Sequence, residues 1–423
     1  MLVISYQLSV ISYLLSGGIG LAFSLNWPKG FLIDSDDRIL FSNKSGSGFF
    51  SGRKIRNLFL CSTTTKKLRL LTDMNNRLLI GFGIFIFTLA ACRPSGQQRS
   101  VTPAFYHWQT EFEITPEENA YLDTTGCKKL YVKILDIGVN AISGEIEPYS
   151  RLTLKATTGI LKWQIVPTIF ITNAVFKNIT PEKTDWLVKK IAVVLAAYSF
   201  EKNMREIQFD CDWTASTRAA FFLFLKKMKQ ALPEKNLSAT IRLHQYKFPE
   251  QAGVPPVSRG MLMFYNTGDI GSEATKNSIF DPKDALKYIE GAPKHYPLPL
   301  DLALPLFSWT LIYREGEFWK IVNGIPPDLR DTTRFEADHR DDSRLQVRKG
   351  TFLSGHYLRP GDRLRTEKIP AGSLLEAAQL ASRMDLAQDM TLAYFYLDST
   401  IIRQYPPKLI HSVCQKTGFT GNN

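Results

Sequence analysis

The stretch EIQFDCDW (Glu206–Trp213), followed by STRAAFFLFLKKMKQAL (Ser216–Leu232), decides the fold. The first part is short and apolar and ends in two carboxylates, which is typical of a strand covered on both faces. The second part carries Phe221, Leu225 and Met228 at helical spacing. A buried strand followed directly by an amphipathic helix indicates a parallel sheet built from strand–helix units.

The same alternation continues on both sides of this unit. Seven further strand-like runs, mostly separated by helices, are AFYHW (104–108), LYVKILDIG (130–138), WQIVPTIFITN (163–173), LSATIRLHQ (237–245), GMLMFYN (260–266), LDLALPLFSW (300–309) and MTLAYFYLD (390–398). Eight such strands predict an α/β fold, a (β/α)₈ TIM-like barrel over residues 104–400 followed by a tail at 401–423.

The connection between the last two expected strands, roughly residues 313–389, is too long for a plain loop. It contains a segment dense in charges of both signs (330–349) and a segment that alternates between Gly and Pro turns (351–369). A helix over 373–384 closes it. We expect a β-rich insertion over the C-terminal rim, where it would shape a pocket. The alternative is that the insertion lies on the surface and has no part in the pocket.

A targeting signal precedes the barrel. Arg77 is followed by the apolar run LLIGFGIFIFTLA (78–90), which is too short for a comfortable membrane span, and then by Ala91 and Cys92. The ending Leu-Ala-Ala-Cys resembles the lipobox of bacterial lipoproteins. This resemblance implies a signal peptide at 74–91 and a diacylglycerol on Cys92. It also implies a tether at 92–103 and a membrane-anchored protein outside the cytoplasm, periplasmic or on the cell surface. The alternative is an uncleaved helix with an incidental cysteine.

Residues 1–73 fit poorly before such a signal, because a signal peptide lies at the N-terminus. They contain a near-perfect repeat, VISYQLS (3–9) and VISYLLS (10–16), which has no helical amphipathy. Our hypothesis is that Met74 is the true start, and N-terminal sequencing of the native protein would test it. The alternative is an additional apolar anchor.

Composition narrows the classes of function. The chain is 44% apolar and 12% aromatic, as expected for a globular protein with a sizeable core. The net charge of +12 comes with a cluster of Lys and Arg before the barrel, and elsewhere basic and acidic residues are interspersed, so we expect no nucleic-acid partner. The five cysteines form no CxxC pair, so we expect no disulfide scaffold, no bound metal and no cofactor.

The candidate binding residues lie at the ends of the expected strands, where barrel proteins hold their ligands. These ends are rich in aromatic and hydrogen-bonding side chains, which suit a carbohydrate because flat rings stack on sugars and polar groups bond hydroxyls. The expected platform is Trp108, Tyr265 and Trp309, the expected hydroxyl partners are Asn173, His244, Gln245 and Asn266, and Asp398 is a candidate second carboxylate. The alternative for each aromatic is core packing, and for His244 it is a structural role.

Asp210 and Asp212 are the most specific candidates for catalytic residues. Two residues apart on a strand, they point the same way, into the barrel, while Cys211 points towards the helices. Two neighbouring like charges raise one pKa and prepare that group for proton transfer. The alternatives are that the pair binds a cation or accepts hydrogen bonds from loop backbone.

The segment IQFDCDWT (207–214) resembles the fourth-strand motif of chitinase-like family 18 glycoside hydrolases, which ends in Asp-x-Asp-x-Glu. Asp210 and Asp212 match the two aspartates, and Trp309 agrees with the tryptophan that floors the sugar subsite. Thr214 stands where the family has its catalytic glutamate, so the family's acid is missing. The overall pattern also looks close to bacterial barrel lipoproteins of unassigned activity.

The resemblance implies a membrane-anchored, glycoside-hydrolase-like barrel that acts on or binds a polysaccharide. If the protein is catalytic, we expect Asp212 to be the acid or the carboxylate that orients the substrate, with Asp210 tuning it. The alternatives are a non-catalytic carbohydrate-binding lipoprotein, which Thr214 favours, and a purely structural envelope lipoprotein.

Overall fold

The computed structural model describes residues 31–33, 39–41, 98–155, 162–198 and 204–418. The chain divides into two compact units, Met1–Arg93 and Pro94–Asn423. In the first unit, β1 (Phe31–Ile33) pairs with β2 (Ile39–Phe41) in antiparallel fashion. The expected signal peptide, the acylated Cys92 and most of residues 1–73 lie outside the described residues.

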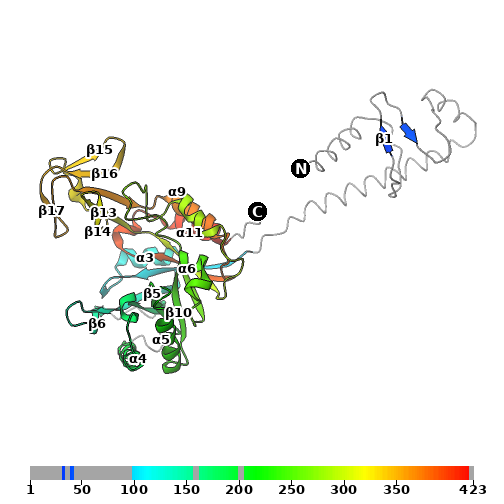
Figure 1. Ribbon diagram of the computed structural model, residues 1–423, viewed down its shortest axis with the longest axis horizontal. Coiled ribbons are helices and arrows are strands. Elements are labelled where there is room, and N and C mark those ends of the chain that lie inside the picture. The colour runs from blue at the N-terminus through cyan, green and yellow to red at the C-terminus, as the bar shows by residue number, and fades with distance from the viewer. Residues whose placement is uncertain (1–30, 34–38, 42–97, 156–161, 199–203, 419–423) are drawn as a thin grey trace, which may run out of the picture. The chain divides into compact units, whose positions relative to one another are not determined.

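The second unit is built on a closed barrel of eight parallel strands, as predicted (Figure 1). In order around the barrel they are β3 (Ser100–His107), β5 (Lys129–Val139), β8 (Gln164–Ile171), β9 (Glu206–Asp210), β10 (Asn236–Arg242), β11 (Arg259–Met263), β12 (Leu300–Pro305) and β20 (Asp389–Phe395). The strand β20 pairs with β3 and closes the ring. The strand β3 begins at Ser100, inside the stretch that we expected to be a tether.

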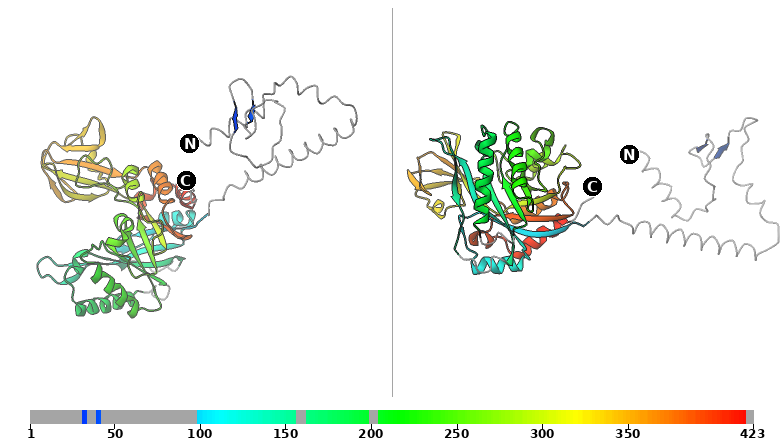
Figure 2. Two further views of the ribbon diagram at one scale, coloured as in Figure 1. Left: turned by 45° about the vertical axis from the view of Figure 1, so that its right-hand side comes forward. Right: turned by 90° about the horizontal axis from the view of Figure 1, so that it is seen from below.

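Helices between the strands cover the outside of the barrel (Figure 2). Thr115 caps the first of them through a reciprocal bond with Glu118, and Thr180 and Asp281 cap two others. The helices are α3 (Pro116–Thr124), α4 (Pro181–Ala196), α5 (Arg218–Ala231), α6 (Leu243–Lys247), α7 (Pro249–Ala252), α8 (Pro282–Ile289), α9 (Ala371–Ala381), α10 (Ser399–Ile402) and α11 (Pro407–Gly418). The expected C-terminal tail therefore contains α11, which packs on α9 and β3.

All the barrel strands except β5 end earlier than the sequence predicts, and three of these early ends affect the predicted site. The strand β9 stops at Asp210, and β10 stops at Arg242, after which α6 begins. The run that we expected to be one strand over 300–309 is divided, because Pro305 has no N–H to donate to a further ladder bond. Trp309 consequently belongs to a separate sheet.

That separate sheet is the β-rich insertion, which forms its own lobe beside the barrel (Figures 1 and 2). Its antiparallel strands, in sheet order, are β14 (Glu317–Asn323), β13 (Ser308–Arg314), β19 (Arg363–Lys368), β16 (Asp341–Val347) and β15 (Phe335–Asp338). A hairpin of β17 (Thr351–Leu353) and β18 (His356–Leu358) adds to it. The lobe has a small core of its own that includes Ile312, Phe335 and Leu358.

A second extension lies on the other side of the barrel mouth. The strand β5 runs on past the barrel and pairs in antiparallel fashion with β6 (Ile146–Arg151). Next to it, the short strands β4 (Glu111–Phe112) and β7 (Thr153–Leu154) pair with each other.

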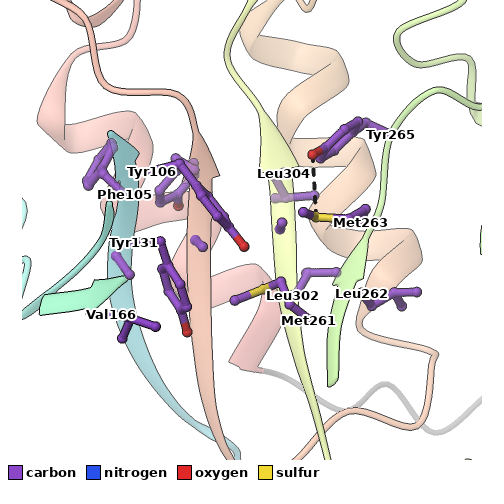
Figure 3. Close-up of a cluster of buried hydrophobic side chains, with 14 of the residues drawn as sticks. Phe105, Tyr106, Tyr131, Val166, Met261, Leu262, Met263, Tyr265, Leu302 and Leu304 are labelled. Atoms are coloured by element: carbon purple, nitrogen blue, oxygen red, sulfur yellow. Dashed lines mark hydrogen bonds between the residues drawn. The ribbon is translucent and has the colours of Figure 1, made fainter. Parts of the chain in front are cut away.

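The interior of the barrel is filled with large side chains (Figure 3). Tyr106 stacks on Tyr131 with ring centroids 4.8 Å apart, and the Tyr106 hydroxyl donates to the Gln208 side chain at 2.7 Å. Met261 is fully buried among them. The barrel is thus a packed core rather than a pore, and a ligand can enter only at the rim.

Candidate functional site

A cavity of about 560 Å³ opens at the C-terminal ends of the strands. Tyr149 on β6 lines it from one side, and Asn323 on β14 of the insertion lines it from the other. Six of the predicted site residues line this cavity: Trp108, Asp210, Asp212, Tyr265, Asn266 and Trp309. The closed ring therefore brings together residues that lie up to two hundred positions apart in the sequence.

Asp210 is the last residue of β9, and its side chain lies almost buried at the base of the cavity, with 4% of the residue exposed. The Thr240 hydroxyl on the neighbouring strand β10 donates to Asp210 Oδ1 at 2.7 Å. Burial raises the pKa of Asp210, and the nearby positive charge of Arg242 offsets this only in part. Asp210 therefore keeps its proton to a higher pH than an exposed aspartate does.

Asp212 follows in the loop and is half exposed. The Arg242 guanidinium, at the end of β10, donates to both Asp212 oxygens, with Nη2 3.1 Å from Oδ2. Burial alone would lower the pKa of Arg242, but the charges of Asp210 and Asp212 outweigh it and hold that pKa above its usual value. Arg242 thus remains charged, and Asp212 is one half of a two-pronged ion pair.

Both carboxylates line the cavity and Cys211 is buried, but Asp212 lies in the loop after β9 and not on the strand that we expected to hold both. We expected Asp212 to be either the acid or the carboxylate that orients the substrate. Because both of its oxygens already accept from the Arg242 guanidinium, this geometry suits orientation of a ligand better than donation of a proton.

Aromatic rings form a continuous wall across the cavity. Phe395 lies at its centre, with ring centroids 5.1 Å from Trp108 and 5.9 Å from Tyr265, which stacks on it. Trp309 continues the wall through Phe307, at 5.2 Å. Tyr265 and Trp309 are nearly buried and serve as the floor, whereas Trp108 is only partly covered and offers more of its ring.

Trp309 is held in place by a buried carboxylate. Its indole Nε1 donates to Glu367 Oε2 at 2.6 Å. The same oxygen accepts from the Ser278 backbone and hydroxyl, and the other oxygen pairs with Arg365 at 2.6 Å. The insertion therefore supplies a ring to the barrel mouth and fixes its orientation, as we expected of a segment over the rim.

Four predicted site residues do not line the cavity: Asn173, His244, Gln245 and Asp398. Gln245 is fully buried on α6, where it accepts from the Arg242 backbone N–H at 2.8 Å and donates to the Trp213 carbonyl at 3.0 Å. His244 is exposed on the same helix, beside a smaller hollow next to the cavity. These two residues left the mouth because β10 ends at Arg242.

The other two residues connect loops. Asn173 Oδ1 accepts from the Thr217 hydroxyl at 2.5 Å, which ties the end of β8 to the start of α5. Asp398 caps α10 by accepting from the Thr400 backbone N–H at 2.8 Å. Both side chains thus hold the rim together rather than face the cavity.

Thr214 is exposed and lies outside the cavity wall. Its hydroxyl lies 3.0 Å from the Ser216 hydroxyl and 3.3 Å from the Thr217 hydroxyl. The position that carries the acid in the motif therefore holds no proton donor of carboxyl type, and it does not reach the cavity in this loop conformation.

A pair of residues that the sequence analysis did not select lies on β5, two strands from Asp210 in the ring. Lys133 Nζ pairs with Asp136 Oδ2 at 2.7 Å and lies over the Trp108 ring, 5.2 Å from its centroid. The Ser150 hydroxyl on β6 donates to the same Asp136 oxygen at 2.8 Å. Lys133 and Asp136 both line the cavity.

Simple alternation along β5 places Lys133 and Asp136 on opposite faces, because they are three residues apart. A bulge at Ile134 breaks the register with β8 and brings both side chains to the cavity. The sequence pattern therefore does not predict that Lys133 and Asp136 share a face, although Asp136 stands near the end of a strand-like run.

No group of three or more His, Cys, Asp or Glu side chains that could hold a metal ion occurs in the part of the chain that the structure describes. Within those same residues, no helix combines the length and the apolar character that crossing a membrane requires.

The sequence matches no protein family and no curated protein sequence with significance. Solved structures with a similar fold include the spore cortex-lytic enzyme SleL of Bacillus cereus, which is 17% identical, with a TM-score of 0.43 and coverage of 78% of this chain and 77% of that chain. The Rhizomucor miehei chitinase RmChi1 is 11% identical, with a TM-score of 0.42 and coverage of 74% and 99%. The catalytic domain of a Pyrococcus furiosus chitinase is 11% identical, with a TM-score of 0.40 and coverage of 77% and 99%.

Proposed function

We propose that this protein binds a polysaccharide in the cavity at the barrel rim, outside the cytoplasm, while a lipid on Cys92 holds it to a membrane. The observation that carries the proposal is the composition of that cavity. Partly exposed rings of Trp108 and Tyr396 lie beside carboxylates and the Asn266 amide in about 560 Å³. Sites of roughly 300–1,000 Å³ with aromatic walls and a few polar groups suit small rings that carry hydroxyls.

Binding without cleavage is the form of this function that the geometry supports best. Hydrolysis of a glycosidic bond needs an acid that reaches the leaving oxygen. Asp212 is held in an ion pair with Arg242, and Thr214 has neither a carboxyl group nor a place in the cavity wall. The cavity therefore has the groups that bind a sugar but lacks a carboxylic acid at the motif's glutamate position.

One observation favours hydrolysis as a second candidate. Asp210 has a raised pKa, which is the property that a general acid needs near neutral pH. In that case Asp210 would protonate the leaving oxygen and Asp212 would orient the sugar.

Oligosaccharide binding and product release, measured on the same panel of glycans, test the proposal. We expect micromolar to millimolar affinity and no release of shorter sugars. Release of products by the wild type that Asp210→Asn abolishes, with affinity retained, would replace the binding function by hydrolysis. A wild type that binds no glycan would leave only a structural envelope role.

Membrane attachment is a separate part of the proposal, and it is supported by the order of basic head, apolar run and Cys92 in the sequence. Cells that express the chain and are fed a labelled fatty acid should yield a labelled protein in the membrane fraction. The Cys92→Ser variant should lose the label. Equal labelling of both forms would contradict the anchor.

A further inference from the structure

The part of the cavity wall at β3 and β5, two strands from Asp210 in the ring, carries a compact polar cluster, formed by Trp108, Lys133, Asp136 and Ser150. Its members come from the end of β3, from β5 and from β6. Lys133 is nine-tenths buried, although it carries a charge, and Asp136 is mostly buried as well. Charged groups are kept out of water in this way only where they are paired and have a defined geometry.

The hydrogen-bonding capacity of this cluster is only partly used. Lys133 and Ser150 both donate to Asp136 Oδ2, while Oδ1 is buried and has no hydrogen-bond partner among the described residues. The Lys133 ammonium has three N–H donors, of which one bonds Asp136. An acceptor without a partner costs about 1–3 kcal/mol, so a donor that reaches Asp136 when a ligand enters the cavity stabilises the cluster.

The neighbouring ring defines what kind of group that is. Trp108 is partly exposed and Lys133 Nζ lies 5.2 Å from its ring centroid, so a sugar in contact with the exposed part of Trp108 is close to the ammonium and the carboxylate. A sugar with two adjacent hydroxyls can donate from one hydroxyl to Asp136 and accept at the other from Lys133. An apolar ligand would leave both groups without partners.

The charges of the cavity also limit the ligand. Among the described residues that line it, Lys133 and Arg242 are the basic ones, and each is already paired with an aspartate. A carboxylate or sulfate on the ligand would therefore compete with an aspartate for each cation and would lie near Asp136, Asp210 and Asp212. Such a charge is disfavoured where water is partly excluded.

We propose that Trp108, Lys133 and Asp136 form a sugar subsite that recognises adjacent hydroxyls on an uncharged ring, and that the ligand is a neutral polysaccharide. This inference rests on the proposed binding function and names its substrate class. Ser150 positions the Asp136 carboxylate and does not itself line the cavity.

Calorimetry with the full-length chain tests the subsite. The ligands are neutral 1,4-linked hexasaccharides of glucose, mannose and xylose, in which the hydroxyls on C2 and C3 are free, and hexagalacturonate as an anionic ligand with the same adjacent hydroxyls. We expect at least one neutral hexasaccharide to bind, and hexagalacturonate to bind at least thirtyfold more weakly. Asp136→Asn and Lys133→Met should each weaken the neutral ligand at least tenfold, and the double variant should lose less than the two effects combined.

A matched control is Asp185→Asn, because Asp185 forms a similar ion pair with Lys227 on α4 and α5, away from the mouth. This variant should bind like the wild type. If Asp136→Asn does not fold, as judged by its thermal transition, Lys133→Met and the comparison of neutral with anionic ligands decide the question.

The outcomes separate the two proposals. A wild type that binds a neutral hexasaccharide, with affinities of both variants within twofold, would overturn the subsite and leave the binding function in place. Equal affinity for hexagalacturonate would overturn the neutral class. A wild type that binds none of these ligands would overturn the subsite and the binding function together.

Discussion

Two parts of the cavity wall, one at β9 and β10 and the other at β3 and β5, contain the same kinds of residues but differ in local backbone structure. On the β9–β10 wall, Asp210 and Asp212 are two positions apart and Arg242 ends the next strand. On the β3–β5 wall, Lys133 and Asp136 meet because a bulge shifts the strand by one residue. Each wall pairs a carboxylate with a cation, but neither pair follows from the period of a regular strand alone, because β9 ends at Asp210 and Asp212 lies in the loop after it.

The largest effect is expected on the β9–β10 wall, where Arg242 lies between two carboxylates. Arg242→Met leaves Asp210 and Asp212 without their cation, and it should lower the free energy of unfolding by about 3 kcal/mol, since removal of one partner leaves buried charge unpaired. Urea denaturation measures this change. Arg403→Met, which breaks the exposed pair with Glu117, should leave the urea midpoint unchanged. Equal midpoints for both variants would show that Arg242 has no special role.

A second test concerns Gln245, which the sequence placed among the ligand contacts and the structure places under the rim. Gln245→Ala removes both bonds to the Arg242 and Trp213 backbone, and it should cost about 2 kcal/mol of stability. Its affinity for a glycan should change less than twofold. Gln404→Ala, at an exposed glutamine, is the control for stability. A loss of affinity without a loss of stability would return Gln245 to the ligand site.

The pH dependence of stability should carry a contribution from Asp210. Its pKa is raised in the folded state above the unfolded value of about 3.9, so the folded protein binds the proton more tightly. This contribution to stability is present at low pH and is lost as the pH rises through the folded pKa. Asp210→Asn should therefore flatten the fall of stability above pH 4. A fall of the same slope in both proteins would contradict the raised pKa.

The smallest effect is expected at Thr214. Because this residue is exposed and outside the cavity, Thr214→Glu should change stability by less than about 0.5 kcal/mol and affinity by less than twofold. It should also produce no glycan cleavage. Thr214→Ala is the matched variant without a carboxyl group. Cleavage by the glutamate variant alone would show that the loop can bring this position to the ligand.

The sequence was sufficient for the barrel, because its strands and helices differ clearly in apolar period and the caps at Thr115, Thr180 and Asp281 are explicit. It was also sufficient for the Asp210 wall and for the rings of Trp108, Tyr265 and Trp309. It failed where backbone geometry departs from the regular strand. The early end of β10 removed His244 and Gln245 from the mouth.

The remaining failures have the same kind of cause. The Lys133–Asp136 pair depends on the bulge at Ile134, and no residue type in this part of the sequence predicts a bulge. Asp398 and Asn173 stand at the ends of strand-like runs, as ligand residues do, but the turns that follow direct them to a helix cap and to Thr217. Sequence alone cannot distinguish these uses of a polar side chain.

The most direct measurement is a crystal structure of the protein soaked with the neutral hexasaccharide that binds best in solution. The account predicts electron density for a sugar ring against Trp108, with hydroxyls within hydrogen-bonding distance of Lys133 Nζ and the Asp136 carboxylate. Density for the sugar only outside the rim cavity, or an empty cavity at a ligand concentration well above the measured Kd, would contradict it.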